Sequence, residues 1–196
     1  MKKILCLIMF LNLIICGCND NKPSQVKNQY DFLLKGVDEN GLIKEFSLKD
    51  FEGQNLIIYF GYGLCPDVCP AAMSIVADVL DEQISLKHLS QNDVKMIFIS
   101  IDPKRDEAKQ MNDFVKYFYQ NSQALIPTEK QLEELAKVYG VRYEIIPLPD
   151  SELKYSVAHS SSIYIFDKNG NFKGEISNLI HKKIVNKLKE FGILKN

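Results

Sequence analysis

Hydrophobic residues in this chain occur in two patterns, as short continuous runs and as runs with helical spacing. The continuous runs NLIIYFGY, from Asn55, and VKMIFISID, from Val94, are typical of strands covered on both faces of a sheet. Segments with helical spacing of apolar residues lie at 73–80, 106–119, 128–140 and 179–193. Strands that alternate with helices in this way predict an α/β domain.

Two turn signals predict β-hairpins near the two ends of that domain. Asn40-Gly41 lies between the apolar-rich segments YDFLLKGV and LIKEFSL, and Asn169-Gly170 lies between IYIF and NFKGEI. Both residues of an Asn-Gly pair tolerate positive φ, which tight hairpin turns require. We therefore expect an N-terminal β-hairpin, and a second hairpin just ahead of the terminal helix.

The stretch GYGLCPDVCPAAM follows the first apolar strand and places Cys65 and Cys69 four residues apart, each before a proline. Because proline disfavours helix in the residue before it, we expect Cys65 beside a helix N-terminus. Pro66 would then be the first helical residue, or the regular helix would begin later. A dithiol between a central strand and a helix is the thioredoxin-like arrangement. We therefore predict a thioredoxin-like central sheet flanked by helices.

The first residues have the pattern of an export signal. Two lysines precede an apolar run over residues 4–15, and a glycine precedes Cys18. The run is shorter than the ~20 apolar residues of a comfortable membrane span. Its end, ICGC, resembles a bacterial lipoprotein box that is cleaved before Cys18 and carries lipid on the Cys18 sulfur. A plain secretory signal and a short uncleaved anchor are the alternatives.

The chain thus divides into a lipoprotein signal peptide (1–17), a polar tether (18–29) and a thioredoxin-like domain (30–196). Lipid on Cys18 would hold the domain at a membrane of the bacterial cell envelope, on the exported (periplasmic) side. The chain has 46% hydrophobic and 25% charged residues, as one ordinary globular domain does. Its formal net charge of −1 gives no indication of a nucleic-acid partner.

The number of cysteines left in the domain limits the roles that they can have. Cys6 and Cys16 leave with the signal and Cys18 is lipidated, so Cys65 and Cys69 remain. A structural disulfide between them would close a very small loop and stabilise little. A redox couple is a second role, although the spacing is CxxxC rather than the usual CxxC. A soft metal such as Cu(I) is a third, since structural zinc normally takes four protein ligands.

A neutral imidazole could complete a trigonal site with the two thiolates, and the chain has three histidines. His88 lies in a polar connector and His181 in the terminal helix, so we expect both at the surface. His159 lies just before an apolar strand, from which it could reach the cysteine loop. A solvated or locally hydrogen-bonded loop histidine is the alternative for His159.

Three segments, GYGLCPDVCP, FISIDPKRD and YSVAHSSSIYIFDKNG, together resemble the Sco/SenC family of copper-binding thioredoxin-like proteins. The resemblance extends over residues 30–196. It implies that Cys65, Cys69 and His159 bind a copper ion. It also implies a partner, the CuA-bearing subunit of cytochrome c oxidase, which receives copper during assembly. Oxidation to a Cys65–Cys69 disulfide would remove the thiolate ligands and release the metal.

Two positions depart from the family pattern. Ala158 stands where many members have an aspartate that could orient the imidazole. Gly63-Leu64 stands where many members have threonine and a larger polar or aromatic residue. These differences bear on metal affinity and on the rim of the site.

We expect several residues near the motifs to have structural roles. We expect Asp67 to satisfy N–H groups of its turn and Asp102 to form a strand-end turn or cap. Arg105 and Asp106 are expected to form a local ion pair. Tyr62 and Tyr155 are expected in core or rim packing, with a place in the lining of the site as the alternative.

The leading hypothesis is a membrane-tethered copper metallochaperone rather than an enzyme. The alternative is a thiol–disulfide oxidoreductase, in which Cys65 attacks a substrate disulfide and Cys69 resolves the mixed disulfide. A peroxidase is less favoured because no activating arginine is evident near the cysteines. A purely structural spacer is the least favoured.

Overall fold

The computed structural model describes residues 28–194. The predicted signal peptide, Cys18 and all but the last two residues of the tether lie outside this range. None of the helices within 28–194 is long and apolar enough to cross a bilayer.

The described chain is a mixed α/β fold, as the sequence pattern predicts. The strands are β1 (Leu34–Val37), β2 (Ile43–Phe46), β3 (Asn55–Gly61), β4 (Val94–Ser100), β5 (Ser122–Ile126), β6 (Tyr143–Leu148), β7 (Lys154–His159), β8 (Ile163–Phe166) and β9 (Phe172–Ile176). The helices are α1 (Val68–Ser85), α2 (Ala108–Phe118), α3 (Glu129–Tyr139) and α4 (His181–Glu190), and short 3-10 helices span Leu48–Phe51 and Gln91–Asp93.

Seven of the strands form one sheet in the order β2-β1-β5-β4-β3-β8-β9. The central strands β3, β4 and β5 are parallel, and the outer strands join antiparallel. Both predicted hairpins are present, and Gly41 and Gly170 have φ of 77° and 74° in their turns. The N-terminal hairpin also extends the main sheet, because β1 pairs with β5.

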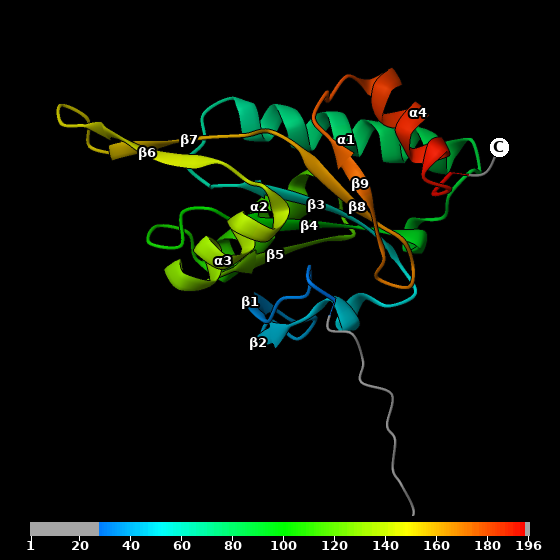
Figure 1. Ribbon diagram of the computed structural model, residues 1–196, viewed down its shortest axis with the longest axis horizontal. Coiled ribbons are helices and arrows are strands. Elements are labelled where there is room, and N and C mark those ends of the chain that lie inside the picture. Colours follow the sequence, from blue (N-terminus) through cyan, green and yellow to red (C-terminus); the bar gives the residue numbers. More distant parts are fainter. Residues whose placement is uncertain (1–27, 195–196) are drawn as a thin grey trace, which may run out of the picture.

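Helices cover both faces of this sheet (Figure 1). The connections β3-α1-β4 and β4-α2-β5 step in the same direction, so right-handed crossovers place α1 and α2 on one face. α4 packs beside α1 on that face. On the other face, Tyr139 of α3 packs edge-on against Phe60 and Tyr164.

Coverage on both faces explains the continuous apolar runs. All seven residues of β3 are buried, and so are six of the seven residues of β4. Ile58 and Phe98 are fully buried at the centre of the core. The end of β3 therefore has a fixed position, and the cysteine loop begins from it.

The sequence patterns did not predict β5 or the hairpin of β6 and β7. β5 is the short segment SQALI, in which buried Ser122 and Gln123 hide a strand signal. β6 has four exposed residues in a row, so it lacks the alternation of a half-buried strand. In Figure 1 this hairpin projects from the body of the domain. It is not part of the main sheet.

Candidate metal centre

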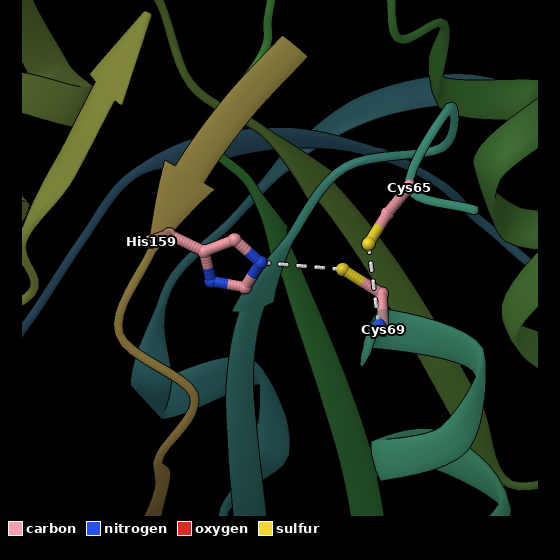
Figure 2. Close-up of side chains that lie close together, drawn as sticks. All are labelled: Cys65, Cys69 and His159. Carbon is pink, nitrogen blue, oxygen red and sulfur yellow. Dashed lines mark hydrogen bonds between the residues drawn. The ribbon is translucent and has the colours of Figure 1, made fainter. Parts of the chain in front are cut away.

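Three side chains that are far apart in sequence meet at the carboxyl end of β3. The sulfur atoms of Cys65 and Cys69 and one ring nitrogen of His159 all lie within 4.8 Å of one another. Figure 2 shows Cys65 in the loop ahead of α1, Cys69 on the first turn of α1, and His159 at the end of β7. The structure thus brings together all three residues that the resemblance implies as ligands.

The cysteine loop is a tight turn that leads directly into α1. The N–H of Cys65 donates to the carbonyl oxygen of Tyr62 at 3.2 Å. α1 begins at Val68 with Asp67 as its N-cap, so Pro66 lies before the helix and the later of the two predicted starts is correct. The N–H of Cys69 donates to Cys65 Sγ at 3.3 Å. Cys65 therefore faces the helix N-terminus, as expected from the Cys-Pro sequence.

The imidazole of His159 has a defined orientation. Its Nδ1 lies 2.9 Å from the carbonyl oxygen of Ser160, which can only accept a hydrogen bond, so Nδ1 carries the proton. Nε2 then presents its lone pair toward Cys69 Sγ, 3.4 Å away (Figure 2). The rings of Tyr59 and Tyr62 pack edge-on against the imidazole, at centroid distances of 6.2 and 6.1 Å.

Burial controls the protonation of the site. Cys69 is fully buried and Cys65 half-buried, and both are free thiols. Burial, with a further contribution from the Cys65 side chain, raises the pKa of Cys69 to about 12. Burial lowers the pKa of His159, so the imidazole is neutral at pH 7. A metal ion entering the site must therefore displace the Cys69 proton, whereas Nε2 is already free to bind.

The donor atoms fit a soft metal ion. Two sulfur atoms and a neutral imidazole nitrogen are the ligands that Cu(I) prefers, and three donors suit its low coordination number. The hydrogen bond from Nδ1 to Ser160 is the type of outer contact that fixes a metal-binding histidine. Within residues 28–194, this is the one group of three or more histidine, cysteine or acidic side chains placed to hold a metal.

The SCO1/SenC family model matches residues 20–191. The chain belongs to the SCO1/SenC family. A SCO2-like protein of Rickettsia typhi is 32% identical over 136 residues, which cover 69% of this chain and 64% of that relative. The matched region thus spans less than two thirds of the relative's length.

Solved Sco structures share the fold and include metal-bound forms. Arabidopsis thaliana ScoI with copper bound is 26% identical, with a TM-score of 0.68, and the match covers 82% of this chain and 99% of that one. Yeast Sco1 with copper bound is 27% identical, with a TM-score of 0.66, and the match covers 82% and 86%. The thioredoxin-like fold predicted from the sequence is confirmed.

The two departures from the Sco pattern lie in different surroundings. Ala158 is exposed on β7, opposite Glu144 of β6. Gly63 is enclosed: a Cβ atom there would lie 2.7 Å from Met111 Sδ and 3.0 Å from Asp106 Oδ1. The small residue at position 63 is therefore matched to the packing of Met111 in this chain.

Two expectations for residues near the site, the Arg105–Asp106 ion pair and the Asp67 cap, are wrong. Arg105 pairs with Asp102 and not with Asp106. Asp106 instead accepts hydrogen bonds from the Gly63 N–H and the Ser100 hydroxyl, at 3.0 and 2.6 Å. Asp67 makes no side-chain capping hydrogen bond, contrary to expectation.

The two tyrosines have different positions. Tyr62 lies beside the imidazole, and its hydroxyl is 3.1 Å from Ser156 Oγ on β7. Tyr155 contacts Asp102 and Arg105.

The other two histidines have local partners. Nδ1 of His88 lies 2.9 Å from Gln83 Oε1. Nε2 of His181 lies 3.4 Å from a carboxylate oxygen of Glu82. Both side chains are partly exposed, and neither belongs to the cluster. The prediction that they lie at the surface is therefore correct in outline.

Proposed function

We propose that this protein binds one copper ion through Cys65, Cys69 and His159 and passes it to another protein. The observation that carries this proposal is the convergence of two thiols and a correctly oriented imidazole within 4.8 Å. Copper bound in the Arabidopsis and yeast relatives supports the choice of metal. Cys65 is half-buried, so an acceptor thiolate could reach the metal from that side and replace the ligands in turn.

The acceptor that we propose is the CuA-bearing subunit of cytochrome c oxidase, which the family resemblance implies. We further propose that lipid on Cys18 holds the domain at a membrane of the cell envelope, on the exported side. Labelling cells with a radioactive fatty acid tests the anchor. Label should be incorporated into the wild-type chain and be lost in Cys18→Ala, and an unlabelled wild type would overturn the lipoprotein proposal.

Titration with Cu(I) in competition with a coloured chelator tests the binding proposal. The reduced full chain should carry Cys6, Cys16 and Cys18 as alanine, so that Cys65 and Cys69 are the remaining thiols. We expect saturation at one ion per chain. His159→Ala should weaken binding, whereas His88→Ala should leave it unchanged as a matched control. Binding without saturation, or binding indifferent to His159, would overturn the proposal.

Thiol–disulfide exchange is the second candidate, and the unequal exposure of the two cysteines favours it. Cys65 is accessible enough to attack a substrate disulfide, and fully buried Cys69 is placed to resolve the mixed disulfide. The products would be a Cys65–Cys69 disulfide and two substrate thiols. His159→Ala separates the two functions, since it should impair copper binding but leave the rate of dithiol exchange nearly unchanged.

A further inference from the structure

The loop of residues 102–106, DPKRD, follows β4 and contacts both elements that carry the candidate ligands. None of its side chains belongs to the Cys65, Cys69 and His159 cluster. Buried Asp106 nevertheless connects to the cysteine turn on one side, and buried Asp102 with half-buried Arg105 connects to β7 on the other. The contacts of Arg105, Asp102 and Asp106 define what this loop does.

Arg105 contacts the chain where β7 begins. Its Nη1 donates to the carbonyl oxygens of Leu153 and Tyr155, at 3.0 and 2.9 Å. Its guanidinium carbon lies 3.6 Å from the centre of the Tyr155 ring, which is a close cation–π contact. One side chain therefore fixes both the backbone and a side chain at the start of the strand that ends in His159.

Asp102 completes this arrangement from the β4 side. It is 3% exposed, and its carboxylate accepts from Arg105 Nε and, at 2.7 Å, from the Tyr155 hydroxyl. Asp102, Arg105 and Tyr155 thus form a closed cluster, which we call the arginine clamp. Removing Arg105 would leave the buried Asp102 carboxylate without its cation, which is unfavourable.

The same loop also holds the cysteine turn. Asp106, 7% exposed, accepts from the Gly63 N–H, two residues before Cys65. Its other carboxylate oxygen accepts from Ser100 Oγ at the end of β4. The loop of residues 102–106 therefore contacts both the cysteine turn and β7.

The hairpin that carries His159 needs such a support. β6 and β7 pair with each other outside the main sheet, and an isolated two-stranded hairpin is at best marginally stable in water. Tyr155 lies four residues before His159 on the same strand. We propose that Arg105, Asp102 and Tyr155 are positioning residues, which set the place of His159 relative to Cys65 and Cys69. As a statement about metal affinity, this inference rests on the proposed copper binding.

A double-mutant cycle tests the clamp in the full chain with Cys6, Cys16 and Cys18 as alanine. We expect Arg105→Met to weaken Cu(I) binding about 10-fold, the low end of the range for direct contacts of metal ligands, because Arg105 acts through β7 and does not touch His159. If the clamp acts through His159, His159→Ala should weaken binding several-fold less in the Arg105→Met background than in the wild type. Independent effects, with the two losses multiplying fully, would overturn the proposal.

Two further variants separate positioning from general damage. Lys104→Met removes the neighbouring cation, which pairs with Glu129 at the surface, and should leave Cu(I) affinity unchanged. Arg105→Lys keeps a charge beside Asp102 and should restore part of the affinity that Arg105→Met loses. If Lys104→Met weakens binding as much as Arg105→Met does, the clamp has no specific role.

Hydrogen–deuterium exchange of the metal-free protein gives a readout that does not depend on copper. In Arg105→Met we expect faster exchange in β6 and β7 and unchanged exchange in β3 and β4. Tyr155→Phe removes a single hydroxyl and should give a smaller effect of the same kind, which decides the matter if Arg105→Met does not fold. If the wild type fails to bind Cu(I), the proposed function falls, but unchanged exchange in β6 and β7 would by itself overturn the clamp.

Discussion

Cys69 lies in the buried core of the domain and Cys65 in the loop just before it, whereas His159 lies at the base of a hairpin that projects from the domain (Figures 1 and 2). The cysteine loop leaves β3, in which every residue is buried, and enters α1, whose apolar side packs in the same core. β6 has four consecutive exposed residues and contributes little to any core. Cys69 is thus positioned by close packing, whereas the imidazole is positioned by its hydrogen bond to Ser160 and by the rings of Tyr59 and Tyr62.

Such a difference would let one site combine a firmly held ligand, Cys69, with a ligand on a less buried element, His159. Close-packed cores resist small displacements, whereas elements with few buried contacts open locally at lower free energy. A metal held by all three ligands could therefore be released stepwise, with His159 leaving first and the thiols last. Five experiments test whether the two regions differ in this way.

The largest difference is expected in stability. Ile58 of β3 is fully buried, so Ile58→Ala should lower the free energy of unfolding by about 2–5 kcal/mol. Ile145 of β6 is 48% exposed, so Ile145→Ala should change it by no more than about 0.5 kcal/mol. Urea denaturation followed by circular dichroism measures both. Equal losses would show that the hairpin belongs to the same core as the sheet.

The next largest effect is expected at the thiols. Cys69→Ser replaces a buried soft ligand with a hard hydroxyl and should weaken Cu(I) binding by at least ~100-fold, beyond the usual range for outer contacts. Chelator competition measures the loss, and far-ultraviolet circular dichroism checks that the fold is kept. His88→Ala, whose side chain lies outside the cluster, is the control. If the Cys69→Ser variant binds Cu(I) normally, Cys69 is not a ligand.

The pH dependence of Cu(I) binding should come from the thiols and not from the imidazole. The pKa of Cys69 is raised to about 12, so metal binding at neutral pH must release that proton. Each unit fall in pH should therefore weaken Cu(I) binding about tenfold for every proton released. The lowered pKa of His159 keeps the imidazole neutral above pH 6.5, so His159→Ala should leave the slope unchanged there. A flat profile between pH 7 and 9 would contradict this assignment.

A smaller effect is expected where the cysteine turn packs on α2. Gly63→Thr would push a Cβ atom against Met111 Sδ and Asp106, and should lower the free energy of unfolding by about 1 kcal/mol. The loss is at the low end of overpacking effects because the Met111 side chain is flexible. It should shrink in a Met111→Ala background, where thermal denaturation can compare the double and single variants. A loss that is independent of Met111 would place the strain elsewhere.

The smallest effect is expected on the exposed hairpin. Ala158→Asp restores the residue of many family members but faces Glu144 across the strand pair, so it should destabilise the hairpin by about 0.5 kcal/mol. Ala158→Lys, with the opposite charge, should be neutral or slightly stabilising. Hydrogen exchange of β6 and β7 compares the two. Identical exchange in both variants would show that the cross-strand charge is irrelevant.

The central strands, the tight turns and the place of the cysteine loop could be predicted from the sequence, because each depends on a local pattern of residues. The runs at β3 and β4 and the Asn-Gly turns follow from backbone preferences and apolar spacing. The two cysteines were identified from their spacing and their place after a strand. These features are confirmed because each depends on residues close together in the chain.

The hairpin of β6 and β7 and its contacts with Arg105 could not be predicted in the same way. β6 lacks alternation because few of its side chains are buried, and the Arg105 partners were misassigned because Asp106 is adjacent in sequence while Asp102 is adjacent in space. The residues alone left His159 open between a ligand and a solvated loop residue; the family resemblance supplied its role. That Nε2 faces Cys69 depends on a strand pairing and a carbonyl oxygen that only the folded chain brings into place.

The α/β class, the two candidate thiols and the family of this chain could all be inferred from the amino-acid sequence. The folded chain was needed to see which nitrogen of His159 is free, which cysteine is buried, and which loop contacts both the cysteine turn and β7. The physical reason is that strand and turn preferences act over a few residues, whereas burial and the orientation of a ligand arise from contacts between distant segments. Cys69 and His159 are 90 residues apart in the chain, and their side chains meet at 3.4 Å.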